Sequence, residues 1–284
     1  MKTLIKWYDG DLFNRLELAL HYLEGMLDAS ADNEPFFGIN RGADGSACAH
    51  HALHIGIPHV TGRACDIMFD IEHTTGQHID PAIEAEYVRY LFSCCEVEDF
   101  LPVYYDPARN NRPFVEFHNL RECMEALVWL CKLRDGKRAR RVIDGFLNTL
   151  LLLTDSETGC LSAERAAAMG PEKAKKFATV THPLTLAQGR LVGPLLLLYR
   201  QTGDRRALQL ATAYARSTLC ICFHDDGRIA DAAHNHVHSI TSSLTGILSY
   251  ACFVGDGEMI DKVRRIYLVG LREAMSDYGY VKEQ

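Results

Sequence analysis

Three histidines alternate with other residues in the segment 234–238, and this is the densest group of side chains in the sequence that could do chemistry. In an extended segment alternate side chains share a face, so His234, His236 and His238 could converge on one ligand. Such imidazoles hydrogen-bond a polar ligand such as a sugar, or bind a metal ion. The alternative is a polar loop whose last histidine caps the next helix. Because Cys and carboxylate partners at metal-ligand spacing are missing, the pattern favours ligand contacts.

Two further histidines stand where helices are expected to begin. Glu116 precedes His118 by two residues, and a carboxylate beside a helix start could act as a general acid or base. Its alternative role is an N-terminal charge that the helix dipole favours. His182 is followed by Pro183, which is typical of the first helical position, so this histidine marks either a helix start or a ligand contact.

Four similar segments would position these side chains. Each begins with a histidine, continues with an apolar helix, turns at a glycine and ends with a more charged helix. The starts are His59, His118, His182 and His238, which lie 59, 64 and 56 residues apart. Each first helix ends at a glycine stop signal. The sequence therefore predicts a repeat of helical hairpins and an all-α fold class.

The two helices of a hairpin differ in charge. Residues 239–255 contain no charged side chain, whereas residues 257–273 contain seven. A helix that is apolar all round is buried, while one with a single apolar stripe covers a core from outside. We therefore predict that each first helix is inner and each second helix outer. The distinction is weaker in the first two units, where Arg121, Glu122 and Glu125 fall on an expected inner helix.

An amphipathic helix at residues 11–27 precedes the four hairpins. Together they make about nine helices, and we predict one all-α domain over residues 1–284. The composition, with 48% hydrophobic and 24% charged residues, is that of a globular chain. The net charge of −7 argues against a nucleic-acid binder, because such proteins usually carry a basic excess.

The same composition argues against a membrane or secreted protein. No apolar run reaches the ~20 residues of a membrane span, and the first residues lack the apolar core of a signal peptide. Ten cysteines occur without a C-x-x-C pair, so we expect buried, reduced thiols. A cytoplasmic protein without nucleic-acid or membrane partners is expected.

Three stretches, at residues 182–189, 234–246 and 276–283, carry a resemblance to the six-hairpin glycosidases. The helical pairs of that family close into an (α/α)6 toroid. Within the family the chain looks most like the β-L-arabinofuranosidase-type and related uncharacterised bacterial members. The resemblance implies a helical-hairpin toroid and a glycoside hydrolase that acts on a carbohydrate substrate.

The chain departs from that family in length. Six units of about 60 residues would need ~360 residues, and four and a half units are present. We therefore expect an incomplete or open toroid, a smaller ring, or a ring completed by another chain. The C-terminal edge is expected to leave an apolar inner-helix face uncovered or to pair with another subunit, as in a homo-oligomer.

The arabinofuranosidase-type relatives hold a zinc ion through cysteines and a late glutamate. Glu283 is the residue that we align with that glutamate, but no cysteine follows it. The zinc cannot be carried over, and no metal or other cofactor is predicted.

In such toroids the pocket lies at the end where inner helices start and outer helices finish. The free N–H groups and dipoles of the inner helices suit polar ligands there. Glycosidic cleavage usually needs one protonated and one ionised carboxyl group. The predicted catalytic residues are Glu116, Asp225, Asp231 and Glu283. The predicted substrate-binding residues are His118, His182, His234, His236, His238, Tyr280 and Arg41.

Each of these predictions has an alternative. Asp225 and Asp231 flank Gly227, and an Asp-Gly loop is also ordinary turn chemistry. The function itself is open between a glycoside hydrolase with an exo-acting pocket, a sugar lyase or epimerase on the same scaffold, and a non-catalytic helical-repeat binding or scaffold module. An enzyme requires the histidines that start the hairpins to open on one end of the helical array.

Overall fold

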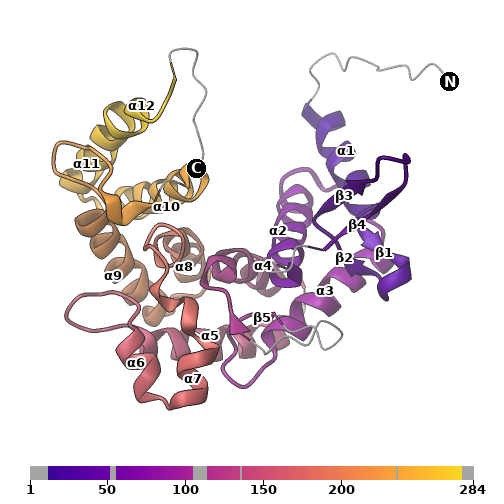
Figure 1. The fold of residues 1–284 in the computed structure, drawn as a ribbon, viewed down its shortest axis with the longest axis horizontal. Coiled ribbons are helices and arrows are strands. Elements are labelled where there is room, and N and C mark those ends of the chain that lie inside the picture. The colour runs from indigo at the N-terminus through magenta and orange to yellow at the C-terminus, as the bar shows by residue number, and fades with distance from the viewer. Residues whose placement is uncertain (1–11, 52–55, 105–113, 135, 235, 277–284) are drawn as a thin grey trace.

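A computed structural model describes residues 12–51, 56–104, 114–134, 136–234 and 236–276 (Figure 1). Its long helices form four consecutive hairpins. These are α2 (Gly56–Thr75) with α3 (Pro81–Cys95), α4 (Leu120–Leu133) with α5 (Lys137–Leu153), α8 (Gln188–Thr202) with α9 (Arg205–Cys222), and α10 (Val237–Val254) with α11 (Gly257–Leu268). The amphipathic helix α1 (Leu12–Glu24) precedes them. The prediction of an all-α helical-hairpin fold is confirmed.

Short elements connect the hairpins. Three antiparallel pairs of strands are β1 (Leu27–Asp28) with β2 (Glu34–Pro35), β3 (Gly38–Arg41) with β4 (Ala47–His50), and β5 (Val103–Tyr104) with β6 (Phe114–Val115). Within the described ranges, the short helices α6 (Ala163–Ala168), α7 (Pro171–Lys176) and α12 (Gly270–Glu273) add to the nine long ones. Single 3-10 turns are η1 (Ala29–Ala31), η3 (Phe117–Asn119), η4 (Ala178–Thr181) and η5 (Asp231–Ala233). All ten cysteines are free thiols, although Cys48, Cys220 and Cys252 are exposed rather than buried.

The first helix of each hairpin is the inner one, as the charge pattern predicts. Helix α2 packs on α4, α4 on α8, and α8 on α10, while α3, α5, α9 and α11 cover this row from outside. In the part of the chain that the structure describes, the row is an open arc that does not close into a ring. Figure 1 shows α4 and α8 lying between α2 and α10. The inner faces of these four helices form what we call the concave face.

Glycines set how closely the inner helices approach. A Cβ atom on Gly62 of α2 would lie 2.6 Å from the carbonyl carbon of Glu122 in α4. At the other end of the arc, a Cβ atom on Gly246 of α10 would lie 2.7 Å from the backbone nitrogen of Gly193 in α8. Any side chain at Gly62 or Gly246 would push two inner helices apart, because the nearest atoms are backbone.

Helix α10 differs from the expectation that it is buried all round. It packs on α8 and α11 but leaves Thr245 exposed, together with Phe253 and Val254 near its end. By length and composition it could cross a membrane, although 44% of it is buried inside the molecule. Its serines and threonines explain the difference. The hydroxyl of Thr245 donates to the carbonyl of Thr241 one turn earlier, so this face tolerates water without carrying charge.

Candidate functional site

The N-terminal ends of the four inner helices lie on the same side of the molecule, and we call this side the mouth. Histidine rings meet there. The ring of His59, in the first turn of α2, stacks on the ring of His118 in η3, with 5.4 Å between centroids. His118 lies 5.7 Å from His236, and His236 lies 5.9 Å from His238 at the start of α10. Residues that are far apart in the sequence thus form one row of imidazoles across the mouth.

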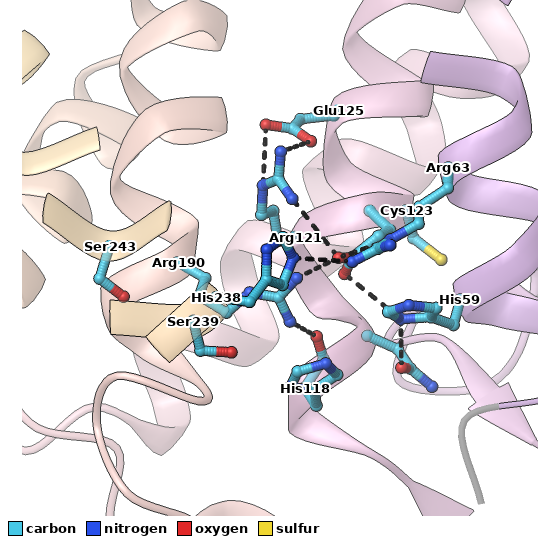
Figure 2. Close-up of polar contacts among 12 residues, drawn as sticks. His59, Arg63, His118, Arg121, Cys123, Glu125, Arg190, His238, Ser239 and Ser243 are labelled. Atoms are coloured by element: carbon cyan, nitrogen blue, oxygen red, sulfur yellow. Dashed lines mark hydrogen bonds and ion pairs between the residues drawn. The ribbon is translucent and has the colours of Figure 1, made fainter. Parts of the chain in front are cut away.

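Below this row, a buried carboxylate joins three helices. Glu122 of α4 is only 1% exposed and forms ion pairs with Arg190 of α8 and Arg63 of α2, the second at 3.6 Å. Arg121 also lies 3.5 Å from it, and Figure 2 shows the three guanidinium groups converging. Burial opposes ionisation of Glu122, but the charges of Arg190 and its other neighbours outweigh burial and lower its pKa to about 2. Glu122 is therefore a permanent anion near neutral pH.

Arg190 ties the start of α8 to the start of α4. Its side chain is fully buried, and besides its ion pair with Glu122 it donates from Nη1 to the carbonyl oxygen of His118 at 2.6 Å. Its Nε atom is buried without a hydrogen-bond partner. A buried guanidinium is costly unless it is paired, so this side chain and Glu122 depend on each other.

One turn further along α4, Glu125 has the opposite ionisation. Arg121 donates from Nε to the Oε1 atom of Glu125 at 3.2 Å. Burial, followed by the nearby charge of Asp66 in α2, nevertheless raises the pKa of Glu125 to about 8. Burial also raises the pKa of Asp66, which accepts a hydrogen bond from the Trp129 indole at 3.0 Å. Glu122 and Glu125 thus share Arg121 as a partner, and one is ionised while the other keeps its proton.

A cavity of about 330 Å³ opens on the concave face between α4, α8 and α10. Glu125 and Arg121 line one side of it, with Arg190 and His238 close to the mouth. The opposite side consists of hydroxyl groups of α10, namely those of Thr241, Ser242, Thr245 and Ser249. A cavity with a titratable acid, fixed cations and a row of hydroxyls suits a small polar ligand with many hydrogen-bonding groups.

A hydrogen bond links α2 and α10, the first and last helices of the inner row. The Nη2 atom of Arg63 in α2 lies 2.9 Å from the Nε2 atom of His238 in α10 (Figure 2). Burial and the charges of Arg63 and Arg190 lower the pKa of His238, so its neutral ring accepts this hydrogen bond. Arg63 therefore bridges the two sides of the mouth.

Glu116 and His182 also meet, as a separate pair at the start of α4. The Nδ1 atom of His182 lies 3.0 Å from the Oε1 atom of Glu116, which is 8% exposed and also accepts the backbone N–H of His118. The nearby Glu116 carboxylate raises the pKa of the half-buried His182, because it favours the protonated ring. The structure thus brings together Glu116, His118 and His182, which the sequence predicts as site residues.

Other predicted site residues lie elsewhere. Asp225 has a fully exposed side chain that accepts a hydrogen bond from Lys262 of α11 at 2.9 Å, and this contact lowers its pKa. Asp231 is exposed at the first position of η5, and His234, exposed as well, follows that turn with a positive φ of 59°. Arg41 is exposed at the end of β3. Tyr280 and Glu283 lie outside the described residues.

Sequence reasoning missed the charges inside the site. Arg63, Asp66, Glu122, Glu125 and Arg190 were not predicted as site residues. A signal was present, because Arg190 is the only full charge in the segment 182–199. A charge on an otherwise apolar helix needs a buried partner, and that partner here is Glu122 on another hairpin. Among the described residues, no group of three or more His, Cys, Asp or Glu side chains could hold a metal ion.

No family model matches the chain, and no curated protein matches its sequence. Its fold is similar to that of an unsaturated glucuronyl hydrolase from Bacillus sp. GL1, with a TM-score of 0.58 at 13% identity over 94% of this chain and 69% of the other. A complex of such a hydrolase with the oligosaccharide dGlcA-Glc-Rha-Glc gives a TM-score of 0.57 at 14% identity, with the same coverage. A family 76 α-mannanase from Bacteroides thetaiotaomicron gives 0.59 at 12% identity, over 96% of this chain and 77% of the other.

These proteins are (α/α)6-toroid glycoside hydrolases. At such low identity the similarity shows that the chain has their hairpin fold, and it assigns no residue a role.

Proposed function

We propose that this protein is a carbohydrate-active enzyme that cleaves a glycosidic bond at the mouth of the helical arc. The observation that carries the proposal is the position of Glu125 on the wall of the cavity beside Arg121, with a pKa of about 8 that keeps it protonated at neutral pH. A carboxyl group that holds its proton at neutral pH is suited to the role of a general acid. The similarity to toroid glycoside hydrolases supports the same reaction class.

In this proposal Glu125 is the general acid. It lines the cavity on the concave face and holds its proton at neutral pH, so it can protonate the leaving oxygen as the glycosidic C–O bond breaks. Asp66 is the second carboxyl group, because its charge contributes more than any other to the raised pKa of Glu125. A water molecule supplies the new C–O bond at the sugar carbon and gives its proton to that second group.

Residues around the mouth would then hold the sugar. His118, His236 and His238 offer imidazole edges to sugar hydroxyls. Glu116 fixes one nitrogen of His182, which leaves the other nitrogen of this half-buried ring to contact the substrate. Glu122 is locked between guanidinium groups, so it positions Arg121 and Arg190 rather than reacting.

The charge of the site favours an acidic sugar. The guanidinium groups of Arg63, Arg121 and Arg190 outnumber the carboxyl groups of Glu122 and Asp66, while Glu125 is protonated. A sugar carboxylate would balance that excess, since guanidinium groups bind carboxylates well. The glucuronyl hydrolases with the same fold act on uronic acids, as their name states, which supports a uronic acid as the substrate class.

The test is turnover on a panel of substrates by wild type and Glu125→Gln. The panel contains 4-nitrophenyl β-D-glucuronide, an unsaturated hyaluronan disaccharide, α-mannobiose, and a 4-nitrophenyl L-arabinofuranoside for the arabinofuranosidase resemblance. We expect turnover of an acidic sugar, and Glu125→Gln should lower kcat by about 10²–10⁴-fold. The matched control is Glu258→Gln in the exposed first turn of α11, which should leave kcat unchanged. Sugar binding without turnover would identify a non-catalytic module instead.

A further inference from the structure

Two cavities adjoin the loop 154–162, which joins α5 to α6 on the outer side of the arc. The first, of about 640 Å³, lies between this loop, Arg165 of α6 and the α9 residues Gln209 to Arg216. The second, of about 720 Å³, follows α6 and reaches Thr181 at the end of η4. Asp155, Thr158 and Arg165 line both, so the two cavities form a continuous groove with Arg165 between its halves.

The groove has the chemistry of a sugar-binding surface. Its hydroxyl and amide groups come from both sides, from Thr154, Ser156, Thr158, Ser162, Thr212 and Gln209. Its charges have both signs, with Asp155 and Glu157 opposite Arg165 and Arg216, so the groove does not select strongly for net charge. The Nε atom of Arg165 lies 3.7 Å from Asp155, and this ion pair places a cation between the two halves of the groove.

The loop that forms the groove is fixed before any ligand arrives. The Oδ1 atom of Asp155 accepts from the backbone N–H groups of Glu157 and Thr158, at 3.1 and 2.9 Å. Gln188 of α8 accepts the N–H of Leu161 at 2.8 Å and anchors the loop to an inner helix. A preformed surface binds a flexible oligosaccharide with less ordering of the protein, which favours affinity.

The groove leads toward the mouth. Its inner end is Thr181, and the next residue is His182, whose ring is paired with Glu116. A chain of sugars that occupies the mouth at one end can therefore continue along η4 and α6 toward α9.

We propose that this groove binds the distal sugars of an oligosaccharide whose reacting end lies at the mouth. The inference rests on the proposed function for the identity of the ligand, but it adds a second site that acts only on longer substrates. Each half of the groove is larger than the cavity at the concave face, so the groove has room for several sugar units.

Two variants remove the groove in different ways. Arg165→Ala combined with Arg216→Ala deletes its two cations, and Ala168→Trp fills the half nearer the mouth. The matched control is Ala167→Trp, which adds the same bulk at an exposed neighbouring position outside the groove. Binding of oligosaccharides is measured by calorimetry on the full chain carrying Glu125→Gln, so that no ligand is consumed.

The probes are hyaluronan oligosaccharides and α-mannan oligosaccharides of two and six sugars. Wild-type groove residues should bind a hexasaccharide more tightly than the disaccharide of the same series. Either groove variant should weaken hexasaccharide binding by about tenfold and change disaccharide binding by less than about twofold. Ala167→Trp should change neither.

The outcomes separate the two proposals. If no length-dependent binding occurs in either series, or if it survives in both groove variants, the groove inference is wrong. If length-dependent binding is lost in the variants while wild type cleaves no glycoside, the groove stands and the proposed hydrolase activity falls.

Discussion

The two halves of the concave face differ in how they are built. Helices α2 and α4 supply the charges, with Arg63 and Asp66 on one and Glu122 and Glu125 on the other. Helices α8 and α10 supply one buried cation, Arg190, and a wall of hydroxyl groups. The groups that could transfer protons are thus concentrated on α2 and α4. Helices α8 and α10 position those groups through Arg190 and offer neutral hydrogen-bonding groups to a ligand.

The largest effect should come from removing the cation that joins the halves. Arg190→Met leaves the buried carboxylate of Glu122 without its closest partner, and we expect a loss of about 3–5 kcal/mol in the free energy of unfolding. Denaturant titration measures it. The control is Arg200→Met at the other, exposed end of α8, which should change stability by less than about 0.5 kcal/mol. Equal losses for the two variants would contradict the joining role of Arg190.

A single methyl group added between two inner helices should destabilise each half of the concave face separately. Gly62→Ala forces α2 from α4, and Gly246→Ala forces α10 from α8, because the new Cβ atoms meet backbone at 2.6 and 2.7 Å. Each should cost about 1–3 kcal/mol in thermal or denaturant unfolding. Gly257→Ala is the matched control, since nothing lies within 4 Å of its Cβ position. If only one of the two substitutions lowered the free energy of unfolding, close backbone packing would not stabilise both halves.

The stability of the charged half, α2 and α4, should also depend on pH, through two groups that act with opposite signs. Glu125 keeps its proton up to about pH 8 when folded, against an ordinary pKa of 4.5, so the unfolded chain binds fewer protons between these values. The contribution of Glu125 to the free energy of unfolding therefore falls as the pH rises from 4.5 to about 8. Relative to wild type, Glu125→Gln should therefore gain more than about 1 kcal/mol of stability as the pH rises from 5 to 9. Unfolding curves at several pH values measure the difference.

Glu122 provides the opposite sign in the same half. Its pKa falls to about 2 on folding, so its contribution is complete above its ordinary pKa of 4.5 and is lost as pH falls toward 2. A Glu125→Gln variant whose stability tracks wild type at all pH values would contradict the protonated state of Glu125.

The smallest effect on stability belongs to the hydroxyl half. Thr245→Ala removes an exposed hydroxyl that bonds only to its own helix among the contacts described, so unfolding should change by less than about 0.5 kcal/mol. Because this hydroxyl lines the cavity, KM for the acidic sugar should rise by about three- to tenfold. Thr149→Ala, on the buried face of the outer helix α5, is the reverse case, with a loss of stability and no direct change in KM.

The hairpins and their inner and outer helices were predictable because charge and apolar periodicity are local properties. The uncharged segment 239–255 and the charged segment 257–273 identify an inner and an outer helix without any tertiary information. The histidines at the helix starts were predictable for the same reason, since each begins a repeated unit. Helix α10, which the pattern describes as buried all round, differs on the face around Thr245, which its hydroxyl groups keep compatible with water, and at its end, where Phe253 and Val254 are exposed.

The charge network was not predictable, because its meaning depends on partners in other hairpins. Glu122 and Glu125 looked like evidence against an inner helix, yet Arg190 makes the first of them compatible with burial. Asp225 looked like a site carboxylate from its loop, yet Lys262 on a following helix holds it at the surface. The sequence marks where charges interrupt an apolar pattern, but only the packing shows which of them meet.

The ion pair between Glu122 and Arg190 also constrains how the molecule is made. Its two residues are 68 positions apart, so during synthesis the carboxylate emerges well before its partner. At a usual translation rate the interval is about 3–14 seconds. During that interval the second hairpin carries an acid with no buried arginine from α8 to neutralise it. The buried form of this end of α4 is therefore complete only after α8 has emerged and supplied Arg190.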